Sequence, residues 1–198
     1  MTARPDRRRA LVDAALEVIG ESGLGGFTQP RVAARAGMRQ SHLTYYFPTR
    51  DDLLVAVAEE AVRRRVALLA ESLAGAEGRA EQVAALARVV SSPEDTRVLL
   101  ALTQAADQNE AVRATFGALA AGVAPLGAEV LATAGSEADP VALALLQATS
   151  TGIAVLSLAR GSDVPFAEQL FTMFLDRLIT TRQDLRGGGV PASPGEYG

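Results

Sequence analysis

The sequence predicts an all-α protein, and three features support this fold class. Ala, Leu and Val dominate the apolar 48% of the chain, whereas aromatic residues make up only 5%, and this balance favours helices over strands. Apolar residues recur at helical spacing, and Pro, Gly or a capping side chain interrupts them where helices would end. With 198 residues, the chain can bury a core as one large domain or two small ones.

The first predicted helix runs from about residue 7 to residue 22, and the glycine-rich segment 23–26 ends it as a turn. Its apolar residues form one stripe that can pack on the helices that follow: Leu11, Ala15, Val18 and Ile19. Before it, residues 1–9 carry four Arg. We expect these residues to be either a disordered terminus or an arm that follows a phosphate backbone.

Residues 28–47 predict two short helices joined by a tight turn. Thr28 can cap the first helix through its hydroxyl, and Pro30 is tolerated in its first turn. Gly37 supplies the left-handed residue that ends this helix, and the second helix is expected from Arg39 to about Phe47. Two helices joined by a glycine-containing turn are typical of a helix-turn-helix.

The second of these helices carries few apolar residues. Met38, Leu43 and Phe47 can anchor one face, and the residues on the other faces can all donate hydrogen bonds. Arg, Gln, Ser and Thr are side chains that read base edges in a major groove, and the absence of an acidic residue suits a partner lined with phosphates. The polar residues are Arg39, Gln40, Ser41, His42, Thr44, Tyr45 and Tyr46.

The net charge of -4 argues at first against a nucleic-acid partner, but the charge is unevenly distributed. Residues 1–50 contain eight Arg and four acidic residues, a net charge of +4. Residues 51–198 contain 11 Arg and 19 acidic residues, a net charge of -8. This asymmetry indicates a basic DNA-binding part joined to an acidic remainder.

Residues 37–53 (GMRQSHLTYYFPTRDDL) resemble the recognition motif of the TetR/AcrR family of bacterial transcriptional repressors. Members show a Gly and an apolar residue in the turn, a tyrosine-rich recognition helix, then an aromatic residue, Pro, Ser or Thr, and a basic residue. The resemblance implies about nine helices, with a helix-turn-helix DNA-binding domain at residues 1–50 and a helical effector-binding and dimerisation domain at residues 51–185. Residues 186–198 are rich in Gly, Pro and Ser, so we expect a flexible tail.

The resemblance also implies which residues contact a double-stranded DNA operator. One set would read base edges: Arg39, Gln40, His42 and Thr44. A second set would bind phosphates and fix register without specifying sequence: Thr28, Arg31, Ser41, Tyr45, Tyr46 and Arg50.

After Pro48, a long helix is predicted from residue 51 to about residue 74, and it joins the DNA-binding part to the rest of the chain. We interpret residues 63–65 on it, all Arg, as a solvated face. Pro125 should kink or split the third of the helices that follow. These helices are expected at residues 79–90, 93–106, 110–134, 140–160 and 165–183.

Residues 140–159 contain no charged residue, and this length could span a bilayer. Because Gln, Ser and Thr interrupt the segment and no basic flank precedes it, we expect a buried helix instead. Members of the family pair their last two helices across a two-fold axis, and the apolar composition of both helices here agrees with a homodimer. The expected interface residues are Leu146, Ser150, Ile153, Phe166, Leu170, Phe174 and Leu178.

Members of the family bind small apolar or amphipathic molecules between the helices of this second domain. An apolar ligand site and a plain helical core use the same residue types, so both interpretations remain open for each candidate. The candidates are Leu86, Leu99, Leu102, Thr103, Phe116, Leu119, Gln147, Phe171 and Met173.

Enzymatic activity is not expected. The chain has one His, His42, and no Cys. It therefore lacks the several His and Cys ligands of a typical metal cluster, and the residues for Cys/His catalysis; a Ser/His pair could use only His42. No cofactor is expected. The lack of Cys suits a cytoplasmic protein. Two alternatives to a repressor remain: a helical ligand-binding or scaffold protein that reads no operator, and a DNA-binding activator or regulator that needs no effector.

Overall fold

The computed structural model describes residues 6–187, and their side chains as far as residue 180. All regular structure in this range is helical, which confirms the all-α fold class. The elements are α1 (Arg7–Ser22), η1 (Leu24–Gly26), α2 (Gln29–Arg35), α3 (Gln40–Tyr46), α4 (Arg50–Ala74), α5 (Gly78–Val90), α6 (Pro93–Ala106), α7 (Glu110–Thr133), α8 (Pro140–Arg160) and α9 (Val164–Gly187).

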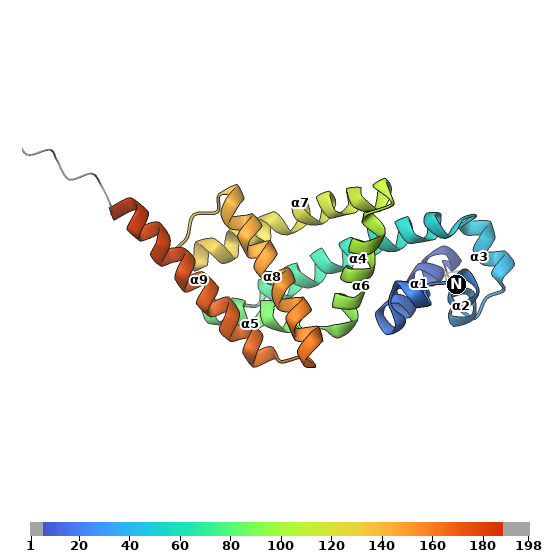
Figure 1. Cartoon of the computed structure of the whole chain (residues 1–198), viewed down its shortest axis with the longest axis horizontal. Coiled ribbons are helices and arrows are strands. Elements are labelled where there is room, and N and C mark those ends of the chain that lie inside the picture. The colour runs from blue at the N-terminus through green and yellow to red at the C-terminus, as the bar shows by residue number, and fades with distance from the viewer. Residues whose placement is uncertain (1–5, 188–198) are drawn as a thin grey trace, which may run out of the picture.

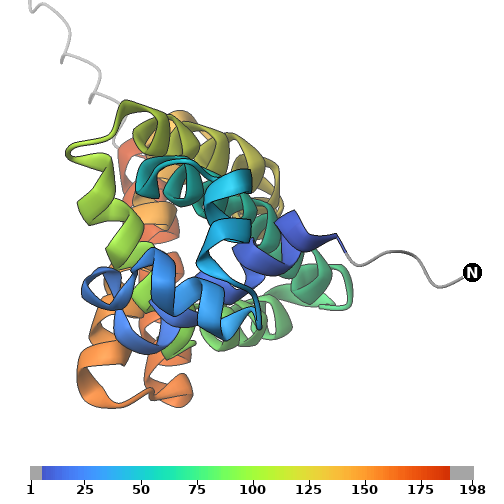
Figure 2. The ribbon, with the colours of Figure 1, turned by 90° about the vertical axis from the view of Figure 1, so that its right-hand side faces the viewer.

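The molecule is elongated, with α1–α3 at one end and α9 toward the other (Figure 1). We call α1–α3 the head and α5–α9 the body; α4 joins them. Figure 2 views the molecule from the head end, where the blue helices of the head lie in front of the rest of the chain. The outer side of the head is therefore free of the helices of the body.

Two apolar cores hold the helices together, and α4 takes part in both. The first core surrounds Phe47 and joins the head to the start of α4 and to α6. The second core surrounds Phe171 and joins the end of α4 to α5 and α7–α9. Leu53 of α4 is buried in the first core and Leu73 in the second. Because packed interiors transmit strain, a shift of α4 in one core must be accommodated in the other.

The start of α4 is fixed by a reciprocal cap. The Thr49 hydroxyl accepts a hydrogen bond from the Asp52 backbone N–H at 3.0 Å, and the Asp52 carboxylate accepts from the Thr49 backbone N–H at 2.9 Å. The carboxylate also accepts from the Thr49 hydroxyl, and these bonds hold the pKa of Asp52 below its ordinary value. This capping box fixes the direction in which α4 leaves the head.

A kink or a split is predicted at Pro125, and the split is wrong, because α7 runs through this residue as one helix. The helix packs along α4, and the two helices are close at Gly122, where an added Cβ would lie 2.7 Å from a methyl group of Val66. This packing offsets the one hydrogen bond that a proline removes from a helix. Only glycine at position 122 permits the two helices to approach so closely.

The first helix begins at Arg7 and ends at Ser22, as predicted. Its start is fixed because the Asp6 side chain accepts hydrogen bonds from the backbone N–H groups of Arg8 and Arg9, so residues 7–9 of the expected basic arm belong to α1. At the other end, α9 continues to Gly187, so the first two residues of the expected tail are helical. Residues 1–5 of the arm and 188–198 of the tail lie outside the described residues.

By length and composition alone, α7 and α8 could each cross a membrane. Only 17% of the most apolar window of α7, and 28% of that of α8, is buried within the protomer. On α8, the exposed large apolar residues are Val141, Leu145, Val155 and Leu156. A contiguous exposed apolar surface of this kind is typical of an interaction site.

Candidate nucleic-acid interface and effector cavity

Helices α2 and α3 meet at a tight turn that Gly37 makes possible. Gly37 has φ +64°, the left-handed conformation expected from the sequence. Its N–H donates to Ala34 O, and the Met38 N–H donates to Ala33 O at 2.8 Å, so the last carbonyls of α2 are satisfied. Leu43 and Phe47 then anchor α3 in the first core. The result is a helix-turn-helix at the free end of the molecule.

The side of α3 that faces away from the core is polar and exposed. Tyr45 is 80% exposed, and its ring meets the edge of Tyr46 at 5.2 Å, whereas Tyr46 is half-buried against the first core. Thr44 is also half-buried, and its hydroxyl donates to Gln40 O or Ser41 O at 3.2 Å. The hydroxyl proton of Thr44 is therefore engaged, whereas its methyl group and the lone pairs of its oxygen remain for a base contact. The remaining predicted contacts on this segment are exposed: Arg39, Gln40, Ser41 and His42.

Two arginine side chains flank α3, and contacts with residues at the end of α1 and in the segment before α2 hold them in place. The Arg31 guanidinium donates to the Ser22 hydroxyl at 2.6 Å. Arg50 stacks over the Phe27 ring at 5.1 Å and donates to Phe27 O at 3.3 Å. Both remain exposed, so each guanidinium is oriented yet accessible.

Three further residues of the head lie close to this surface. Thr28 occupies the N-cap of α2, but its hydroxyl makes no capping hydrogen bond, so the predicted cap is wrong and the exposed hydroxyl is uncommitted. Arg8 lies over the Phe47 ring at 5.1 Å, close to the end of α3; the Arg cluster at residues 7–9 was its only signal in the sequence. Arg35 is held by Glu21 at 2.5 Å and by Glu17 at 3.1 Å, so its charge is already neutralised.

A large cavity of about 1100 Å³ lies between α4 and the helices of the body, and it extends to α1 of the head. This volume matches the upper end of ligand-binding pockets. Its walls come from α4–α8 and also from α1, through residues that include Leu16 and Gly20. Seven predicted effector residues line it: Leu86, Leu99, Leu102, Thr103, Phe116, Leu119 and Gln147.

Two of the predicted effector residues, Phe171 and Met173, do not line the cavity. Phe171 is fully buried in the second core, and Met173 is 54% exposed. Both belong to α9, which packs across α5 and α8 on the far side of the body (Figure 1). The cavity faces the other surfaces of those helices, so α9 cannot reach it.

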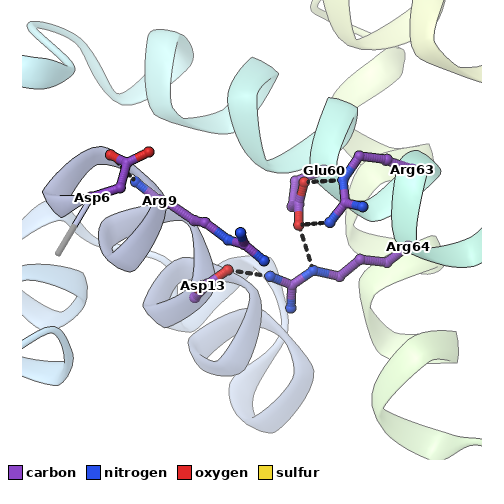
Figure 3. A network of polar contacts seen from close by, with 6 residues as sticks. All are labelled: Asp6, Arg9, Asp13, Glu60, Arg63 and Arg64. Atoms are coloured by element: carbon purple, nitrogen blue, oxygen red, sulfur yellow. Dashed lines mark hydrogen bonds and ion pairs between the residues drawn. The ribbon is translucent and has the colours of Figure 1, made fainter. Parts of the chain in front are cut away.

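The expected solvated face at residues 63–65 holds for Arg63 and Arg64, which are both exposed although each is also paired. Arg64 donates from Nε to Glu60 at 2.7 Å and from Nη2 to Asp13 of α1, so it joins the head to α4 (Figure 3). Hydrogen bonds from Arg63, and then from Arg64, lower the pKa of Glu60 to about 2 against the opposing effect of burial. The network therefore stays ionised at neutral pH.

Arg65 points inward, contrary to expectation, and lines the cavity together with Arg64. Its side chain is 24% exposed. Its Nη1 donates to Val89 O at 3.0 Å, and the Asp95 carboxylate lies 3.9 Å away. Burial lowers the pKa of Arg65 despite the opposing attraction of Asp95. Successive helical residues point about 100° apart, which is why three adjacent arginines have three different environments.

The predicted dimer residues divide into two groups. Leu146 and Ile153 are 6% and 3% exposed and belong to the second core, so their prediction as interface residues is wrong. Ser150 is half-buried, and its hydroxyl donates to Leu146 O at 2.8 Å. The others are half-buried on α9, where a partner could still contact them: Phe166, Leu170, Phe174 and Leu178.

Comparison with known proteins identifies related sequences. The family model described as bacterial regulatory proteins, tetR family, matches residues 11–57. A helix-turn-helix transcriptional regulator from the dhlA 5′ region of Xanthobacter autotrophicus is 30% identical over 178 residues, which cover 85% of this chain and 88% of that protein. The transcriptional regulator BetI of Rhizobium meliloti (strain 1021) is 36% identical over 115 residues, and this match spans only 56% of its length.

The fold is shared with solved structures as well. The multidrug binding protein EbrR, complexed with ethidium, superposes with a TM-score of 0.64 and 29% sequence identity, covering 86% of this chain and 99% of that chain. The Xanthobacter protein and EbrR both match this chain along most of its length, well beyond the helix-turn-helix. The chain belongs to the TetR family and is a helix-turn-helix transcriptional regulator.

Proposed function

We propose that the protein is a dimeric repressor that binds a pseudo-palindromic operator and is released by a small molecule in the cavity. The observation that carries this proposal is α3, whose polar residues are exposed while Leu43 and Phe47 anchor it in the core. Two copies of α3 would enter successive major grooves, with centres ~34 Å or somewhat more apart. Acting on DNA, the protein would work in the cytoplasm.

The DNA contacts divide by chemistry. Gln40 and His42 would read base edges, with Arg39 beside them and the Thr44 methyl group as an apolar contact. Arg31 and Arg50 would bind phosphates in their fixed orientations. The exposed hydroxyl groups of Thr28, Ser41 and Tyr45 would add weaker phosphate contacts. Tyr46, which is half-buried, would contact a phosphate at the edge of the surface.

Replacing Gln40 by Ala tests base reading. We expect the variant to lose about 1–3 kcal/mol of operator affinity and to relax preference at one or two base pairs. The measurement is fluorescence anisotropy against the protein's own upstream region and against single-base variants of the bound site. Arg50→Ala serves as the contrast, because loss of a phosphate contact weakens all sequences alike. Equal weakening by Gln40→Ala on every sequence would contradict the assignment.

The apolar surface of α8 supports a homodimer. Leu145 and Leu156 are exposed on it, beside the half-buried apolar residues of α9. A two-fold axis through α8 and α9 would bury these residues against their copies, since such an interface is self-complementary. Leu146, although adjacent in sequence to Leu145, lies on the inner side of α8 and takes no part.

Leu156→Glu is expected to weaken dimerisation and to raise the dimer dissociation constant at least about a hundredfold. The change removes buried apolar surface in both copies and places two charges in an interface without water. Sedimentation equilibrium measures the effect. Leu100→Glu is the matched control, because Leu100 is also an exposed leucine (42%, against 47% for Leu156) but lies on α6. Equal dimerisation of both variants would place the interface elsewhere.

The position of the cavity supports release by an effector. Residues Leu16 and Gly20 of α1 belong to its wall, and Arg64 in the same wall is paired with Asp13 of α1. A molecule that fills the cavity would therefore contact the head directly and change its placement on α4. The spacing of the two α3 helices would no longer fit the operator. By linkage, operator DNA must weaken effector binding by the same factor.

A further inference from the structure

The cavity wall is almost wholly apolar, despite the polar residues within it. Several hydroxyl groups of its Thr and Ser residues donate to their own helices, as Thr103 does to Leu99 O at 2.8 Å and Thr115 does to Val112 O at 2.6 Å. Phe116 is the one aromatic residue among the described residues of the wall. Cations such as quaternary ammonium groups are held by several aromatic faces, which this wall does not offer.

Of the two arginines in this wall, Arg65 has the fewer hydrogen-bond partners. A guanidinium has five N–H donors, and among the described residues only Val89 O accepts a hydrogen bond from it. Asp95, at 3.9 Å, is too distant for a hydrogen bond, and its side chain is about half exposed to water. Arg64, the other arginine of the wall, is by contrast bonded to both Glu60 and Asp13.

The surroundings of Arg65 leave its charge under-compensated. Burial has a larger effect on its pKa than the attraction of Asp95, so the pKa is lowered, although a guanidinium stays protonated in a protein. Removing a charge from water costs free energy unless a partner and hydrogen bonds replace the water. A ligand with an oxyanion could supply both, because a carboxylate accepts two parallel hydrogen bonds from a guanidinium.

We propose that the effector is an amphipathic anion, with a carboxylate or similar oxyanion that pairs with Arg65 and an aliphatic part that fills the cavity. This assignment rests on the proposed function, since it names the ligand of the same site. It differs from the ligand in the related structure of EbrR, whose ethidium is a cation. Four carboxylates also belong to the wall. Glu17 and Glu21 are paired with Arg35, and Glu94 and Asp95 lie on the solvated first turn of α6, where water screens their repulsion.

Three amphiphiles with the same chain and different head groups test the proposal: decanoate, decanol and decyltrimethylammonium, each below its micellar concentration. Isothermal titration calorimetry with the full chain is expected to show decanoate binding at least about tenfold more tightly than decanol. In Arg65→Gln, decanoate should bind only as well as decanol, whose affinity stays unchanged. Arg88→Gln, which alters an exposed arginine of α5 outside this cavity, should behave as the wild type.

The proposal is overturned if decyltrimethylammonium binds most tightly, or if Arg65→Gln retains the preference for decanoate. Far-UV circular dichroism checks folding, and Arg65→Lys provides a second variant that keeps the charge but loses the paired geometry; it should bind decanoate with intermediate affinity. Operator release is measured separately. If decanoate binds through Arg65 but does not release the protein from DNA, the anion site is supported and the proposed release mechanism is contradicted. If decanoate does not bind while the protein still binds DNA, only the assignment of an anionic ligand is contradicted.

Discussion

Replacing Phe47 by Ala is expected to unfold the head and abolish operator binding. Phe47 is 2% exposed and lies in the first core between the end of α3 and the start of α4. Truncating a buried Phe costs about 3–5 kcal/mol, through lost burial and the cavity that remains. The change also removes the ring under Arg8. Thermal unfolding should show a large loss of stability, and hydrogen exchange should locate it in α1–α3.

Tyr45→Ala is the matched control, because it truncates another aromatic residue of the same segment that is 80% exposed. Exposed substitutions usually change stability by no more than about 0.5 kcal/mol, so this variant should keep its melting temperature while losing part of its DNA affinity. If Phe47→Ala melted like Tyr45→Ala, the head would not depend on the first core. Retention of α5–α9 in the Phe47 variant would show that the second core is stable without the head.

The helices themselves could be predicted because local signals mark their ends. Gly37 and Pro48 act within a few residues, as does the Thr49 cap of α4 that the structure shows, and the observed helices begin and end close to the expected positions. The polar exposed side of α3 follows from the same local pattern, since Leu43 and Phe47 leave only one face for the core. Here sequence periodicity and tertiary packing agree.

The faces of the body helices could not be predicted in the same way. On α8 nearly every position is apolar, so the pattern does not distinguish Leu145, which is exposed, from Leu146, which is buried. The sequence likewise does not distinguish Arg63, which is exposed, from Arg65, which is partly buried, because the two residues differ only in the direction in which their side chains leave α4. Which side of a uniformly apolar or uniformly charged stretch is buried depends on contacts with distant helices.

Operator binding is expected to weaken by about a thousandfold or more between about 50 mM and about 200 mM salt, as for proteins that make six or more phosphate contacts. Arg31, Arg39 and Arg50 are exposed beside α3, and a dimer presents each of them twice. Arg50→Ala should lower the slope of log K against log salt concentration by about two, because it removes a phosphate contact from each protomer. Arg88→Ala, on the body, should leave the slope unchanged.

The acidic remainder of the chain does not oppose this expectation. Residues 51–198 carry a net charge of -8, and α4–α9 extend away from the head along the long axis of the molecule (Figure 1). Charges separated by more than about 8–10 Å are largely screened at physiological salt, so the DNA interacts chiefly with the basic head, where Arg35 alone is neutralised by Glu17 and Glu21. A slope near zero would mean that the exposed arginines of the head meet no phosphates, and the protein would then be a ligand-binding protein of this fold that reads no operator.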